Sequence, residues 1–109
     1  MAISEMTWHE VFDACQGRCQ YCGADLVSSL LAYRCAEVDH LLPPSNPDRD
    51  KPENLVLACR PCNGSLSRAH GLGLFTVAQR KAYLEGTNAG FEARRIQHFK
   101  AIYGRTPVE

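Results

Sequence analysis

The chain has 109 residues and is expected to form one domain; 45% of the residues are hydrophobic but only 8% are aromatic, which suits a small core that needs a staple. Twelve Lys/Arg balance twelve Asp/Glu, so the net charge alone argues neither for nor against a polyanionic partner. No apolar stretch approaches the length of a membrane span, which excludes the transmembrane class.

The opening segment, MAISEMTWHEVFDAC, carries acidic residues where a secretory signal has a basic region and an apolar run. We therefore expect a cytoplasmic protein without a membrane partner. Thiols stay reduced in that compartment, where paired Cys-x-x-Cys units more often hold a metal.

Charge is unevenly distributed along the chain. Residues 1–62 hold five Lys/Arg and nine Asp/Glu, a balance of −4, whereas residues 63–109 hold seven and three, a balance of +4. The basic C-terminal part could lie along phosphates, although a solvated helical surface explains the same charges equally well.

Helix and turn signals organise the start of the chain. Ser4 or Thr7 is a candidate N-cap, and the helical spacing of apolar residues predicts a helix from there to about Cys15. Gly17 is expected to break this helix. Residues 19–23 then suit a tight knuckle.

A hairpin is predicted in the middle of the chain. Residues 26–38 are apolar and partly alternating, which predicts a strand that closes near Asp39. Prolines with Asn and Asp make residues 43–50 a loop. The apolar run NLVLAC, residues 54–59, suits the returning strand.

The rest of the chain is predicted to be helical. Pro61 suits the first turn of a helix. Thr76 is expected to cap a second helix that Gly86 ends, and Asn88 to cap a third, which Gly104 follows. The candidates for the buried side of that last helix are Phe91, Ile96, Phe99 and Ile102. The whole is an α+β arrangement.

Four of the six cysteines form two Cys-x-x-Cys pairs separated by 36 residues. Each pair brings two thiolates onto one metal, and two pairs complete the closed tetrahedral set typical of structural zinc. We expect these four thiols to hold one structural Zn²⁺: Cys19, Cys22, Cys59 and Cys62. Unrelated buried or disulfide-bonded cysteines are the alternative. Cys15 and Cys35 are expected to be small buried hydrophobes, with a ligand role as their alternative.

Polar side chains gather around the predicted hairpin. Asp39 offers a hard carboxylate oxygen suited to Mg²⁺ or Mn²⁺, and the His40 imidazole can take a proton from water. Asn54 stands at the start of the second strand. Asn63 directly follows the last cysteine, so a zinc site would hold its amide oxygen in place. A surface histidine, turn residues and helix caps are the ordinary alternatives.

This arrangement resembles the HNH endonucleases of the ββα-metal (His-Me finger) group. Their signature is roughly Cys-x-x-Cys, acid-x-Asp-His, Asn-Leu, then Cys-x-x-Cys followed by His or Asn, and it is matched in order and spacing. Residues 15–64 carry the match as a motif core; a helical extension, 65–104, and a short tail, 105–109, would complete a single nuclease domain over 1–109.

The resemblance implies a small ββα-metal core with a structural four-cysteine zinc site, flanked by an N-terminal helix and C-terminal helices. It implies an endonuclease that hydrolyses DNA phosphodiester bonds. Asp39 and Asn63 would hold one catalytic Mg²⁺ or Mn²⁺ against the scissile phosphate and the leaving 3′ oxygen. His40 would be the general base, and Asn54 would fix the loop that orients it. The zinc would lie remote from the chemistry.

Some features depart from the family pattern. The third letter of the motif is Asn63 rather than histidine, a variant that is familiar in the family and keeps an oxygen ligand. The following residues lack a common lysine, for which Arg68 could substitute. Asp39 and His40 are adjacent, so the strand is expected to bend just after Asp39 for both to serve one site. Glu37 shares the Asp39 face and is a further candidate for the metal or an outer water.

DNA contacts are expected from basic residues beyond the motif: Arg68, Arg80, Lys81, Arg94, Arg95 and Lys100. The active form is expected to be a monomer or a homodimer. The alternatives are a catalytically inactive, zinc-stabilised nucleic-acid-binding module and a disulfide-stapled interaction domain. His9, His70 and His98 have no partner at informative spacing and are expected to be structural.

Overall fold

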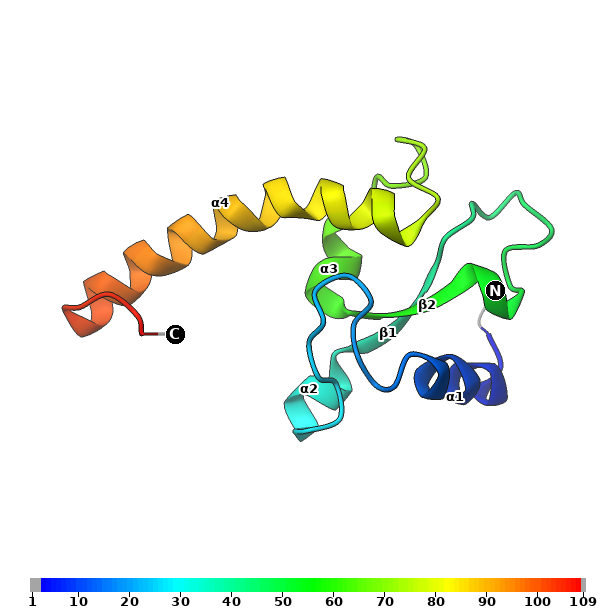
Figure 1. Cartoon of the computed structure of the whole chain (residues 1–109), viewed down its shortest axis with the longest axis horizontal. Coiled ribbons are helices and arrows are strands. Elements are labelled where there is room, and N and C mark those ends of the chain that lie inside the picture. The colour runs from blue at the N-terminus through cyan, green and yellow to red at the C-terminus, as the bar shows by residue number, and fades with distance from the viewer. Residues whose placement is uncertain (1–2, 109) are drawn as a thin grey trace.

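The computed structural model describes residues 3–108, which form helices around one small antiparallel sheet (Figure 1). In chain order the elements are α1 (Glu5–Ala14), α2 (Leu30–Arg34), β1 (Ala36–His40), the 3-10 turn η1 (Pro52–Asn54), β2 (Leu55–Cys59), α3 (Arg60–Ser65) and α4 (Val77–Tyr103). The expected α+β class is confirmed. Among the described residues, no helix combines the length and apolarity needed to cross a membrane.

The two strands form the expected hairpin. β1 and β2 pair antiparallel, from Ala36 opposite Cys59 to His40 opposite Leu55. The loop over residues 41–54 joins them, and α3 follows β2 without a connecting residue. The chain therefore has the strand–strand–helix order that the family resemblance implied.

The strand expected over residues 26–38 is wrong before Ala36. Asp25 accepts hydrogen bonds from the backbone N–H groups two and three residues later (2.9 and 3.1 Å). Ser29 accepts one from the N–H three residues later (3.1 Å) and so caps α2. These local side-chain bonds give the backbone an alternative to a strand ladder, so the apolar residues lie in a turn and a short helix.

The expected bend after Asp39 is also wrong, because β1 stays paired through His40. Adjacent side chains of a regular strand point to opposite faces. The Asp39 carboxylate accordingly meets Tyr21 and Arg80, whereas the His40 ring meets Asp50. The two side chains are therefore set in different surroundings.

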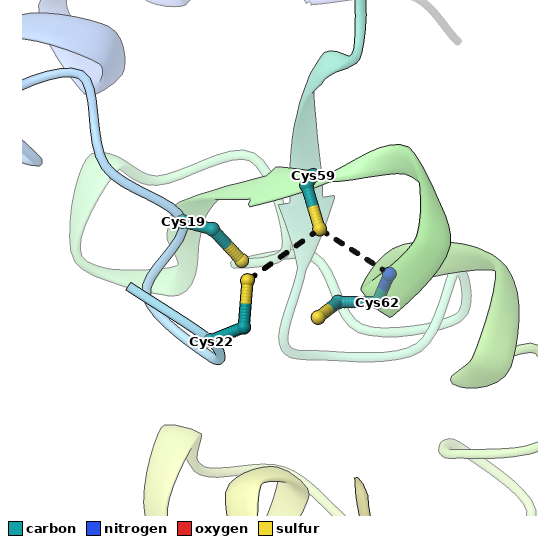
Figure 2. A group of neighbouring side chains, drawn as sticks. All are labelled: Cys19, Cys22, Cys59 and Cys62. Carbon is teal, nitrogen blue, oxygen red and sulfur yellow. Dashed lines mark hydrogen bonds between the residues drawn. The ribbon is translucent and has the colours of Figure 1, made fainter. Parts of the chain in front are cut away.

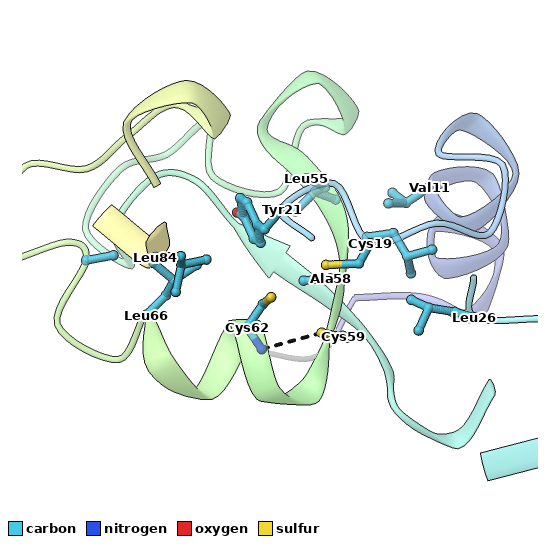
Figure 3. Close-up of a cluster of buried hydrophobic side chains, with 12 residues drawn as sticks. Val11, Cys19, Tyr21, Leu26, Leu55, Ala58, Cys59, Cys62, Leu66 and Leu84 are labelled. Carbon is cyan, nitrogen blue, oxygen red and sulfur yellow. Dashed lines mark hydrogen bonds between the residues drawn. The ribbon is translucent and has the colours of Figure 1, made fainter. Parts of the chain in front are cut away.

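β2 forms the centre of a small core, in which Leu57 and Ala58 are fully buried. The backbone N–H of Gln20 donates to the Leu57 carbonyl (2.9 Å), which fixes the Cys19–Cys22 knuckle beside this strand. Apolar side chains from other segments complete the cluster in Figure 3, including Val11 of α1, Leu66 beyond α3 and Leu84 of α4.

α4 is one continuous helix, so the expected division at Gly86 and Asn88 is wrong. Its start is confirmed: Thr76 accepts from the Gln79 backbone N–H (3.1 Å), and the Gln79 side chain completes a capping box. A glycine inside a helix lowers the stability of the helix by about 1 kcal/mol relative to alanine. This penalty is too small to end a helix that is otherwise well capped. The helix ends at Gly104, whose φ of 72° is left-handed.

The C-terminal half of α4 extends away from the rest of the molecule (Figure 1). The prediction that this part of the helix has a buried side is therefore wrong, because the core ends near Leu84. Phe91 is 53% exposed and Ile102 is 71% exposed. Ile96 is exposed as well, whereas Phe99 is half-buried.

Candidate functional site

Four cysteines converge where the knuckle meets the end of the hairpin (Figure 2). The sulfur atoms of Cys19, Cys22, Cys59 and Cys62 all lie within 4.8 Å of one another. The Sγ atoms of Cys22 and Cys59 are 3.8 Å apart. A tetrahedral zinc with Zn–S bonds of about 2.3 Å separates its sulfurs by roughly 3.8 Å, so the cluster has the dimensions of a zinc site.

Local structure explains how the second pair of cysteines is presented. Cys59 is the last residue of β2 and the N-cap of α3, where its sulfur accepts the Cys62 backbone N–H (3.5 Å). Pro61 occupies the first turn of α3, as predicted. The same turn therefore starts the helix and aims two thiols at one point.

The crowding of the four thiols favours a bound cation. The hydrogen bond between Cys19 and Cys59 lowers the pKa of Cys19 and raises that of Cys59. Burial raises the pKa of Cys62 to about 12. Four crowded thiolates repel one another unless a metal supplies compensating charge.

All six cysteines carry free thiols, which leaves the disulfide alternative without support. Cys15 and Cys35 lie outside the metal-sized cluster, as expected, but each is half-buried rather than buried. The Cys15 sulfur instead accepts the backbone N–H of Leu57 (3.4 Å).

Asp39 lies in a buried polar cluster. Its Oδ2 accepts from the Tyr21 hydroxyl (2.6 Å) and from Nη1 of Arg80 (2.5 Å). Burial, followed by the hydrogen bond with Asp39, raises the pKa of Tyr21 well above its ordinary value. The phenol therefore keeps its proton and remains a donor to the carboxylate.

Arg80 is 1% exposed, so the expectation that it contacts DNA is wrong. It lies on the first turns of α4, on the face that packs inward with Leu84. Besides Asp39 and the Tyr21 hydroxyl, its guanidinium donates to three backbone carbonyls, those of Leu74 (2.7 Å), His40 (3.3 Å) and Leu41 (3.2 Å). The sequence could not separate this buried arginine from the surface residues Lys81, Arg94, Arg95 and Lys100, because all of them lie on α4.

His40 lies at the end of β1, with Nε2 2.8 Å from Oδ1 of Asp50. His70 was expected to have no functional partner, but its Nε2 lies 3.0 Å from the His40 carbonyl. A carbonyl only accepts, so His70 donates. Asp50 and His70 come from irregular segments, and no spacing in the sequence linked them to His40.

Asn54 ties together the ends of the loop between the strands. Its side chain donates to the Asp48 carbonyl (2.9 Å), and its own carbonyl accepts the N–H of Leu41 (2.9 Å). Leu41 directly follows His40. Asn54 therefore connects Asp48, inside the loop, to the residue that follows β1.

Asn63 lies in α3, opposite β1. Its Nδ2 donates to Oε1 of Glu37 (3.0 Å), and Arg60 Nε donates to the other carboxylate oxygen (3.0 Å). The hydrogen bonds thus join Asn63 to Glu37 and join Asp39 to Arg80. Glu37, two residues before Asp39, is the acid that the sequence marked as a further candidate.

The other basic residues expected to contact DNA lie outside the core. Arg68, Arg94, Arg95 and Lys100 are all exposed. Arg94 lies over the Phe91 ring at 4.7 Å, and Arg95 forms an ion pair with Glu92 (2.6 Å). Lys81 is exposed on the same helix as the buried Arg80.

A comparison with protein families supports the sequence resemblance. Residues 19–68 match the model of the HNH endonuclease family, described as HNH endonuclease. The matched segment contains the four-cysteine cluster, both strands and α3. A comparison with curated proteins finds no match. The family match and the metal-sized cysteine cluster together assign residues 19–68 to the HNH endonuclease family.

Proposed function

We propose that this chain is a divalent-metal-dependent endonuclease that hydrolyses DNA phosphodiester bonds. His40 is the general base, Asp39 and Asn63 hold the catalytic metal, and the four cysteines hold a structural zinc. The observation that carries the proposal is the His40–Asp50 pair at the end of the hairpin of an HNH segment.

The hydrogen bond to Asp50 defines which nitrogen of His40 can act. An ionised carboxylate only accepts, so Nε2 keeps its hydrogen and Nδ1 carries the free lone pair. Nδ1 takes a proton from water, whose oxygen attacks the phosphorus atom. The bond from phosphorus to the 3′ oxygen then breaks, and that oxygen takes a proton from solvent.

The proposed metal ligands keep suitable atoms available. Among the described residues, the hydrogen bonds of Asp39 use Oδ2 alone and the side-chain bond of Asn63 uses Nδ2 alone. Oδ1 of each residue is left as a hard oxygen donor suited to Mg²⁺ or Mn²⁺. A bound divalent metal neutralises charge on the phosphate and acts as a Lewis acid.

The DNA is proposed to lie along the exposed basic residues, which are Arg68, Arg94, Arg95 and Lys100. Contacts of this kind neutralise phosphates without reading base sequence, and they weaken steeply as salt rises. Asn54 acts at a distance from the phosphate by fixing the loop next to His40.

A second candidate is a zinc-stabilised nucleic-acid-binding module without catalysis. The regular pairing of β1 through His40 favours it, because adjacent side chains of a regular strand point to opposite faces, whereas the proposed reaction needs Asp39 and His40 at one phosphate.

Plasmid cleavage with added Mg²⁺ or Mn²⁺ tests the proposal. We expect zinc-loaded wild type to cut, and His40→Ala to be slower by about 10²- to 10⁴-fold, the contribution typical of a general base. His98→Ala, which changes an exposed histidine of α4, is the matched control and should cut like wild type. Absence of cutting by folded, zinc-loaded wild type on supercoiled, linear, branched and single-stranded DNA would favour the binding module.

A further inference from the structure

We propose that Tyr21 and Arg80 are positioning residues that hold Oδ2 of Asp39 and thereby present Oδ1 to the catalytic metal. Through Tyr21, the zinc knuckle then orients a metal ligand of the second site. This inference rests on the proposed function, since it assigns helpers to the metal ligand named there.

The carboxylate of Asp39 is held on one side only. Tyr21 and Arg80 both donate to Oδ2, at 2.6 and 2.5 Å, and Arg80 Nη1 also lies 3.3 Å from the Tyr21 hydroxyl. Two donors that converge on one oxygen fix the rotation of the carboxylate about its last bond. A metal ligand held in this way loses less freedom on binding than a mobile one.

Arg80 is anchored independently of Asp39. Its Nε donates to the Leu74 carbonyl, and its Nη2 donates to the carbonyls of His40 and Leu41. The bond to Asp39 uses neither of these two nitrogens, because it comes from Nη1. A guanidinium fixed at three other points remains in place when the carboxylate gains a metal. It is therefore part of the wall of the site rather than a counter-ion that the metal displaces.

Tyr21 links this wall to the cysteines. It lies between Cys19 and Cys22 in the knuckle, and it is 7% exposed. Figure 3 shows its ring within the buried cluster that includes Cys19 and Cys62. Zinc bound by the two flanking cysteines would fix the backbone on either side of Tyr21. The phenol would thus reach Asp39 from a position that depends on the zinc site.

The affinity of the zinc-loaded protein for Mn²⁺, measured from the electron paramagnetic resonance signal of free Mn²⁺, tests this inference without using activity. Tyr21→Phe keeps the buried ring and removes the hydroxyl. We expect it to weaken Mn²⁺ binding about 10-fold, the lower end of effects for partners of a metal ligand, with zinc content and thermal stability retained. Tyr33→Phe is the matched control, because that ring packs against Trp8 and Phe12 on the outside of α2.

Asp39→Asn separates this inference from the proposed function. Loss of Mn²⁺ binding in Asp39→Asn, with wild-type affinity in Tyr21→Phe, would overturn the positioning role and leave the metal site standing. Unchanged binding in Asp39→Asn, or no binding by wild type, would overturn the metal site and this inference with it. Tighter binding in Tyr21→Phe would also overturn the inference, since it would mean that the cluster competes with the metal.

Discussion

At the scale of single residues, the Arg80 side chain connects α4 to the hairpin through hydrogen bonds. Only a planar group with five N–H donors can serve a carboxylate, a phenol and three carbonyls at once, so lysine is no equivalent replacement. A buried ion pair of this kind adds little over an apolar pair of similar shape. Breaking one side of it leaves a buried charge, which is costly.

Arg80→Leu should therefore lower the free energy of unfolding by about 3–5 kcal/mol, because Asp39 loses its partner while still buried. Urea denaturation of the zinc-loaded protein measures the change. Lys81→Leu, at the exposed neighbouring position, should change stability by about 0.5 kcal/mol or less. Adding Asp39→Asn to Arg80→Leu should recover part of the loss; a double variant no more stable than the single one would contradict this assignment.

At the scale of elements, the parts of the fold that follow from local signals were predictable from the sequence. The β2 run, the Pro61 turn and the Thr76 cap each act within a few residues, and the structure confirms all three. Residues 26–35 were not predictable in the same way, because the Asp25 and Ser29 side chains outweigh an apolar pattern. Gly86 predicted the end of a helix, but α4 continues through it to Tyr103.

The candidate site was predictable to a similar extent. The four cysteines followed from their spacing, and their cluster has the expected dimensions. The partners of the catalytic candidates did not follow, because tertiary packing alone brings Tyr21, Asp50, His70 and Arg80 to the hairpin. The surface assignment of Arg80 failed for that reason.

Gly86 offers a direct test of the continuous helix. Its Cβ position is open, so Gly86→Ala should raise the free energy of unfolding by about 0.5–1 kcal/mol. Gly86→Pro should lower it by about 3 kcal/mol. Far-UV circular dichroism and urea denaturation measure both changes. Gly90→Ala, at a second open position, should add helicity with less effect on the free energy of unfolding, because that turn lies beyond the core. Equal stability of the alanine and proline variants at Gly86 would instead indicate a helix break at that residue.

At the scale of the whole molecule, the core is thin because the sheet has two strands and half of α4 lies outside it. The cysteines join the Cys19–Cys22 knuckle, the end of β2 and α3 at one point. A metal bound there in the folded state alone would contribute its binding free energy to folding. The stability of the molecule should then depend on zinc more than on apolar burial.

Zinc removal by a chelator should therefore unfold the hairpin and α3, with loss of the circular dichroism signal and recovery when zinc returns. Acid should act in the same direction. Burial raises the pKa of Cys62 to about 12, so zinc must displace a proton from this thiol, and zinc affinity falls as pH falls. A zinc-sensitive dye should report release as the solution goes from neutral to mildly acidic pH, whereas a fold that survives chelation unchanged would show that the zinc is dispensable.

Cys59 ends a strand, caps a helix and offers a metal ligand, and Asn63 follows four residues later on that helix. Each residue inserted or deleted in between would turn Asn63 by about 100° around the helix axis. Substitutions at Arg60 or Gly64 keep the number of residues unchanged and therefore do not turn Asn63 around the helix axis. Changes of chain length are therefore tolerated beyond the core-packed turns of α4, whereas the junction between β2 and α3 has a fixed length.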